Sequence, residues 1–199
     1  HMLSRFSVNE RKDLYPNDES LARAYAKVIT EEIYNVVNEG CNYIQFDEPV
    51  WTENVDETVW AADVLNEIIL KFPEVKFNLH VCGGNAHRKR GFFGKYTDMI
   101  SAFKKLKIDE IHLEHCSLHY TMLDVFKEWN FKGKISLGVI DQRIDSIETE
   151  EDIKNAIKPA LEYFPKDKIL LTSECGFGHV PIDIVRSKIK ILVATANKL

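Results

Sequence analysis

The sequence predicts an α/β fold in which parallel strands alternate with helices, as in a partial (β/α)8 barrel. Five apolar segments of strand length begin at intervals of about thirty residues, a spacing typical of repeated strand–helix units. Residues able to bind metals or substrates follow several of these strands, and a (β/α)8 barrel carries its active site at the carboxyl ends of its strands. Five units do not close an eight-stranded barrel. We therefore expect one domain over residues 1–199, which forms about the last five units of such a barrel behind an extra helix.

The extra helix is predicted between a polar segment and a glycine. Residues 3–17 are polar and irregular, and Asn17 or Asp18 can cap the helix that follows. Apolar residues then recur at helical spacing until Gly40, where the helix should end. The next apolar run, 42–46, predicts the first buried strand.

The rest of the chain repeats the strand–helix pattern. Gly83 and Gly84 open a loop after one strand, and Thr149 and Pro181 suit the starts of two later helices. Further strands are expected at 75–81, 108–114, 134–140 and 168–173, and further helices at about 56–71, 95–106, 119–129, 149–164 and 181–197.

The composition suits a globular domain in the cytoplasm. With 199 residues, of which 45% are hydrophobic, the chain can bury a sizeable core. A net charge of −5 without a basic stripe argues against nucleic-acid binding, and no apolar run is long enough to predict a membrane span. We expect no signal peptide, and the four cysteines suit a reducing compartment. We interpret His1 and Met2 as the remnant of a cloning tag.

Three separated stretches carry candidate metal ligands at strand ends. His80 and Cys82 lie two residues apart, so on a strand their side chains face the same side. Glu114 ends another predicted strand, and Cys175 follows a third. One imidazole, two thiolates and a carboxylate form a suitable tetrahedral set for Zn2+. We expect zinc to be bound by His80, Cys82 and Cys175, with Glu114 as a weaker fourth ligand that an incoming thiol displaces.

Two other cysteines need separate interpretations. Cys116 lies two residues beyond Glu114 and could replace it as the fourth ligand. We prefer Glu114, because Cys116 should already lie in the loop after the strand. Cys41 precedes its strand at the opposite end of the sheet and is expected to be a buried structural cysteine.

Charged residues follow two more strands. Asp47 and Glu48 come directly before Pro49, at a strand end suited to binding a substrate ammonium group or holding a base. The alternative is a strand end that simply faces water. Asp141 and Arg143 occupy the equivalent place on another strand. Arg143 could bind a carboxylate through two hydrogen bonds, or it could form an ordinary salt bridge at the rim.

Five motifs at these strand ends resemble the cobalamin-independent methionine synthase family. In chain order they are YIQFDEP (43–49), HVCGGN (80–85), HLEHCS (112–117), LGVID (137–141) and SECGF (173–177). From Ser20 onward, their order and spacing are similar to the back part of that family's catalytic barrel, and closest to its short single-barrel members. No single motif is specific, but the combination is.

The resemblance implies a zinc-dependent methyltransferase that methylates the thiol of homocysteine to form methionine. It implies zinc ligands at His80, Cys82, Glu114 and Cys175, and binding of the substrate amino group by Asp47. The interpretation of the residues alone arrived at the same positions.

The chain also departs from the family pattern. The family has a catalytic histidine after the strand equivalent to 134–140, where this chain has Asp141, Gln142 and Arg143. Asp141 is taken to stand at that position, and no catalytic residue is assigned. The strands that would supply other contacts to homocysteine and folate are not in the sequence. Methylfolate and a methylcorrinoid therefore both remain candidate methyl donors, and coenzyme M remains an alternative thiol.

A different interpretation is a non-catalytic, zinc-binding part of a barrel that needs a partner chain. The open edges of a parallel sheet favour pairing with another chain. We therefore expect either a homo-oligomer or a longer native polypeptide.

Overall fold

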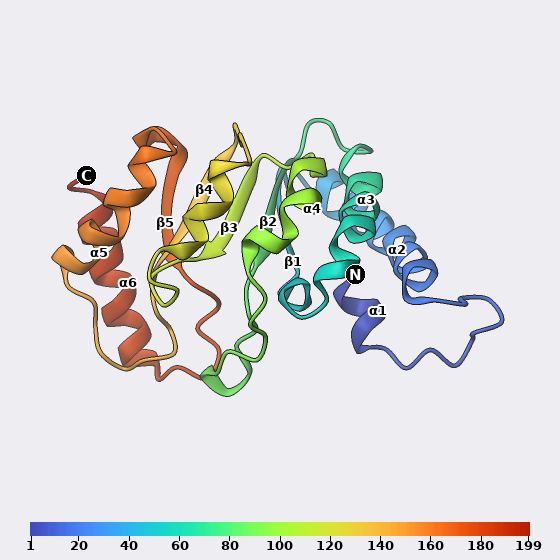
Figure 1. The fold of residues 1–199 in the computed structure, drawn as a ribbon, viewed down its shortest axis with the longest axis horizontal. Helices are drawn as coiled ribbons and strands as arrows, with labels where there is room; N and C mark the ends of the chain where they lie inside the picture. Colours follow the sequence, from blue (N-terminus) through green and yellow to red (C-terminus); the bar gives the residue numbers. More distant parts are fainter.

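The computed structural model describes residues 1–199 and contains the predicted parallel sheet. Its five strands follow the order β1-β2-β3-β4-β5, and every neighbouring pair is parallel. The sheet is open rather than closed into a barrel (Figure 1). The strands, all close to their predicted bounds, are β1 (Tyr43–Asp47), β2 (Lys76–Val81), β3 (Glu110–Glu114), β4 (Lys134–Ile140) and β5 (Ile169–Ser173).

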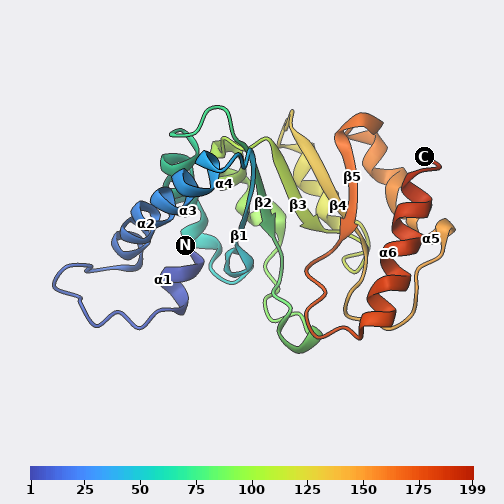
Figure 2. The same ribbon diagram turned by 180° about the vertical axis from the view of Figure 1, so that it is seen from behind.

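Helices occupy most segments between the strands, as the helical periodicity predicts. Asn17 begins α2 with a capping box, because its side chain accepts a hydrogen bond from the backbone N–H of Ser20 at 2.8 Å. Figures 1 and 2 show α2 and α3 beside β1, and α5 and α6 beside β5. The α-helices are α1 (Met2–Phe6), α2 (Asp18–Asn38), α3 (Thr58–Ile69), α4 (Ile100–Lys105), α5 (Glu150–Ile157) and α6 (Ile182–Ala196).

Some helical predictions are wrong in detail. The segment expected to be irregular before α2 contains the short helix α1. This helix contacts the rest of the fold through the Met2 N–H, which donates to the Glu48 carboxylate at 3.1 Å. The helix expected at 119–129 is the 3₁₀ helix η5 (Thr121–Lys127). Over so few residues the apolar spacing does not separate a 3₁₀ helix from an α-helix.

Two longer helices are also partly 3₁₀. The segment expected at 95–106 begins as η4 (Tyr96–Met99), and the one expected at 149–164 ends as η6 (Lys158–Glu162). The second change has a clear cause, since Pro159 has no N–H to continue the α-helical hydrogen bonds.

The two faces of the sheet differ in character because alternate strand residues point to opposite sides. One face is apolar and packs against the helices in a cluster of 35 buried residues that includes Phe77, Leu113 and Leu137. The other face is polar. Along one row of this face, the strand register places Asp47 beside His80, His80 beside His112, and His112 beside Ser136, and the last three are buried. His80, the candidate metal ligand on β2, therefore belongs to the polar face.

Both outer strands of the sheet pair on one side only. At the β5 edge lies an apolar groove of about 470 Å³, whose lining includes Leu161, Leu170 and Leu199. Leu161 and Leu170 are both exposed there. No helix in the structure has the length and apolar character needed to cross a membrane.

Candidate metal centre

His80, Cys82 and Cys175 meet at the carboxyl ends of the strands. Their ligand atoms all lie within 4.8 Å of one another, and the two sulfur atoms are 3.8 Å apart. β3 and β4 separate β2 from β5, and neighbouring strands lie about 4.8 Å apart, so a flat sheet would keep these residues well separated. The curvature of the sheet and the turn after β5 bring them together.

The chemistry of these three residues fits a zinc ion. Both ring nitrogens of His80 are buried without a hydrogen-bond partner, which is costly unless something else binds them. The sulfur separation is much longer than the about 2.05 Å of a disulfide, and both cysteines are free. A histidine and two thiolates are the soft donors that zinc prefers, and they leave a fourth position for an exchangeable ligand.

The pKa values of the two cysteine thiols are shifted in opposite directions. The hydrogen-bond contact between the two sulfur atoms lowers the pKa of Cys175, and the nearby His80 ring lowers it further. The same interaction, together with burial, raises the pKa of Cys82. One thiolate is therefore favoured in this pair before any cation binds, and a bound cation would favour the second.

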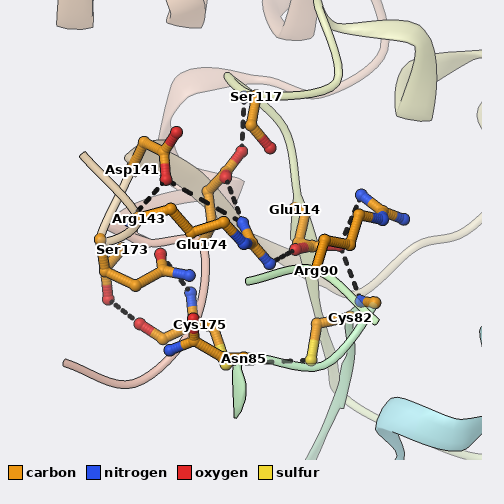
Figure 3. A network of polar contacts seen from close by, with 12 residues as sticks. Cys82, Asn85, Arg90, Glu114, Ser117, Asp141, Arg143, Ser173, Glu174 and Cys175 are labelled. Carbon is orange, nitrogen blue, oxygen red and sulfur yellow. Dashed lines mark hydrogen bonds and ion pairs between the residues drawn. The ribbon is translucent and has the colours of Figure 1, made fainter. Parts of the chain in front are cut away.

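Glu114, the predicted fourth ligand, lies beside these residues but is held by other groups. It is completely buried at the end of β3. The Gly83 N–H donates to its Oε2 at 2.8 Å, and Arg90 forms an ion pair with the same oxygen at 2.9 Å. Its Oε1 is paired with the guanidinium of Arg143 (Figure 3). Unlike the His80, Cys82 and Cys175 ligand atoms, its oxygens are not part of the compact group.

Glu174 and Arg90 are site residues that the sequence interpretation missed. Glu174 is completely buried, and its Oε1 accepts hydrogen bonds from the backbone N–H groups of His115 at 2.9 Å and Ser117 at 2.7 Å. Its Oε2 is 3.1 Å from Nη1 of Arg143, and burial raises its pKa. Its place directly before Cys175 at a strand end was the signal that could have identified it. Arg90, in a loop, offered no comparable signal.

Arg143 therefore binds carboxylates of its own chain. Its guanidinium lies between Glu114 and Glu174 and also donates to the Gly84 carbonyl at 3.0 Å (Figure 3). Its side chain is only 12% exposed, so the salt bridges are buried rather than placed at an open rim. Asp141 supports this turn, since the Arg143 N–H donates to the Asp141 carboxylate at 2.8 Å.

The other two cysteines lie outside the compact group. Cys116 is not part of the group formed by His80, Cys82 and Cys175. It lies close to Glu174 instead, and burial raises the pKa of its thiol. Cys41 is only partly buried, which corrects the expectation of a buried residue. The cause is its place just before the edge strand β1, where its thiol contacts the Tyr43 carbonyl at 3.4 Å.

Asp47 and Glu48 point in different directions, as neighbours at a strand end should. Asp47 lines a cavity of about 380 Å³ together with His80, Cys82 and Cys175. Its carboxylate is exposed and accepts a hydrogen bond from Gln45 at 2.8 Å. Glu48 is buried instead, where burial raises its pKa and its carboxylate pairs with the amino terminus at 3.2 Å. The structure thus places Asp47, and not Glu48, in the cavity with the cysteines.

Comparison with known proteins relates the sequence to one family. Residues 8–198 match the family model described as the catalytic domain of cobalamin-independent synthase. The chain is 33% identical to a methionine synthase of Sulfolobus acidocaldarius, over 95% of this chain and 51% of that protein. It is 28% identical to a methionine synthase of Saccharolobus solfataricus, over 97% of this chain and 54% of that protein.

The fold is similar to that of a solved structure. A B12-independent methionine synthase from Shewanella sp. W3-18-1, in complex with selenomethionine, superposes with a TM-score of 0.77 and 27% identity. The match covers 94% of this chain and 56% of that one, and it confirms the predicted partial barrel. The chain spans about half the length of the relatives it matches. Together the family model, the relatives and the fold show that this chain belongs to the catalytic domain of the cobalamin-independent methionine synthase family.

Proposed function

We propose that this chain holds the zinc ion of a methionine synthase and binds homocysteine for methylation at sulfur. The observation that carries the proposal is the group of His80, Cys82 and Cys175, whose buried imidazole has no partner and whose cavity also contains Asp47. The names of the relatives support the reaction. The selenomethionine complex of the Shewanella protein supports an amino acid as the ligand.

Each residue has a distinct part in this proposal. When bound, zinc would keep the substrate thiol ionised at neutral pH and still nucleophilic. His80, Cys82 and Cys175 would hold the ion, and Glu114 stands beside them as the candidate fourth ligand. Asp47 is the register partner of His80 and has an exposed carboxylate that forms no salt bridge, which suits an ammonium group within the same cavity.

The ammonium group separates two thiol substrates. Homocysteine carries an ammonium group as well as a thiol, whereas coenzyme M carries a sulfonate and no amino group. A carboxylate in the cavity attracts the first and repels the second, so Asp47 favours homocysteine. A methylated folate is the donor we propose, and a methylcorrinoid is the alternative that a donor assay must test.

X-ray absorption at the zinc edge tests this proposal directly. The zinc-loaded chain should show two sulfur neighbours, and homocysteine should add a third with loss of an oxygen neighbour. Asp47→Asn should weaken the homocysteine response about tenfold and leave zinc content unchanged. Three sulfur neighbours before any thiol is added would point to Cys116 as a ligand. Equal responses of the wild type and Asp47→Asn would contradict the role of Asp47.

A further inference from the structure

Four charged side chains form a buried network next to the candidate metal ligands. Glu114 and Glu174 are both completely buried, and Arg90 and Arg143 are the cations that contact them. The two buried carboxylates face two guanidinium groups, and Asp141 adds a third carboxylate 4.0 Å from Arg143. Figure 3 shows Arg143 between the two carboxylates and Arg90 on the other side of Glu114.

Both oxygens of Glu114 are already bound. Oε2 accepts from Gly83 and pairs with Arg90, and Oε1 pairs with Arg143. The Glu114 oxygens lie outside the compact group of His80, Cys82 and Cys175, so Glu114 must turn toward that group to bind a metal ion and give up a guanidinium contact as it moves. The Arg143 contact is buried and hydrogen-bonded, and the Arg90 contact is an ion pair, so both compete with a metal for the carboxylate.

If Glu114 turns away from the arginines, Arg143 still pairs with a second carboxylate. Arg143 keeps Glu174 at 3.1 Å and the Gly84 carbonyl at 3.0 Å. Glu174 itself stays fixed by the hydrogen bonds that it accepts from the backbone N–H groups of His115 and Ser117. Arg90 keeps the Phe92 carbonyl at 2.8 Å, and its side chain, 14% exposed, loses its one carboxylate partner. Two arrangements of Glu114 are therefore available at limited cost, one on the arginines and one turned away from them.

We infer that Arg90 and Arg143 are positioning residues that control whether Glu114 binds the metal. This inference rests on the proposed zinc site. By competing for the carboxylate, the two arginines keep Glu114 a weak and exchangeable ligand, so that the fourth position opens to the substrate thiol. Glu174 anchors Arg143 in the place from which it competes.

The test measures zinc affinity by competition with a chromophoric chelator. Arg90→Met and Arg143→Met should each bind zinc about tenfold more tightly than the wild type, because Glu114 is released to the metal. Homocysteine should then compete less well for the fourth position by a similar factor. A merely structural role would predict weaker zinc binding after either substitution. The matched control is Lys89→Met in the same loop, since the Lys89 side chain is exposed and should leave the affinity unchanged.

A Glu114→Gln background separates this inference from a simple effect of charge. If the arginines act through Glu114, adding Arg90→Met or Arg143→Met to Glu114→Gln should change zinc affinity less than about twofold. An undiminished effect in that background, or unchanged affinity in both single variants, would overturn the inference. Arg90→Met keeps the test decisive if Arg143→Met fails to fold. Failure of the wild type to bind zinc would instead overturn the proposed function.

Discussion

His80 and His112 lie side by side on the polar face of the sheet, with ring centroids 4.1 Å apart. His112 also contacts the carbonyl of Ser173 through Nε2 at 2.8 Å, and Ser173 is the last residue of β5. β4 lies between β3 and β5, so this contact crosses the curved face rather than following the ladder of the sheet. His112 thereby links the strand of His80 to the strand that leads into Cys175.

Replacing either cysteine of the compact group should abolish zinc binding. We expect the purified chain to hold about one zinc ion, and Cys82→Ser and Cys175→Ser should each lose it, because a hydroxyl is a poor ligand for zinc. Cys41→Ser is the control and should retain full zinc content, since Cys41 lies at the other end of β1. Metal analysis after dialysis gives the result. Full zinc in both ligand variants would contradict the assignment.

Gly138→Ala should destabilise the protein and disturb the buried charge network. A Cβ at this position would lie 2.8 Å from Cα and 2.9 Å from Cγ of Glu174, and 3.0 Å from the Leu113 carbonyl. We expect a loss of about 1–3 kcal/mol in the free energy of unfolding, as for other overpacked sites. Gly178→Ala is the control, because nothing lies within 4 Å of its added Cβ. Urea unfolding measures both variants, and equal stabilities would show that β4 and β5 separate without cost.

His115 should make the fold less stable at mildly acidic pH. It is completely buried with Nε2 2.7 Å from the Ala156 carbonyl, and burial lowers its pKa to about 4. Between its ordinary value of 6.5 and about 4, the unfolded chain takes up a proton that the folded chain does not. Stability is therefore lost as the pH falls through this range.

The comparison of wild type with His115→Gln isolates this contribution. Glutamine can still reach the Ala156 carbonyl but does not titrate. Between pH 7 and pH 5, we expect the wild type to lose about 2 kcal/mol more unfolding free energy than the variant. Denaturant titrations at the two pH values measure this. Parallel losses in the two proteins would show that His115 is not buried as a neutral group.

The purified chain should self-associate through its open edges. The outer edges of β1 and β5 carry backbone N–H and C=O groups without a strand partner, and an apolar groove follows the β5 edge. Leu161→Glu and Leu170→Glu place charges in this groove and should shift the molar mass measured by light scattering toward the monomer. Arg186→Glu on α6, outside the groove lining, is the control for added charge. A stable wild-type monomer that methylates homocysteine rapidly would contradict the view that the barrel is incomplete.

Local features of the sequence determined the strands, most helices and the three candidate ligands that the structure brings together. The spacing of His80 and Cys82 places both on one face by strand geometry alone. Cys175 follows from its position after the last strand. The same alternation places Asp47 and Glu48 on opposite sides, because a shift of one residue reverses the direction of a side chain. These are properties of short segments, so they could be predicted without a tertiary structure.

Tertiary structure alone decided the environment of Glu114. Its partners Arg90 and Arg143 come from different loops, and no local pattern predicts that both guanidinium groups converge on one carboxylate. The distance between Cys82 and Cys175 likewise depends on the curvature of the whole sheet, since two strands separate their positions. Sequence patterns report which face a residue occupies. The contacts of Glu114 with two arginines depend on distances that only the packed, curved sheet establishes.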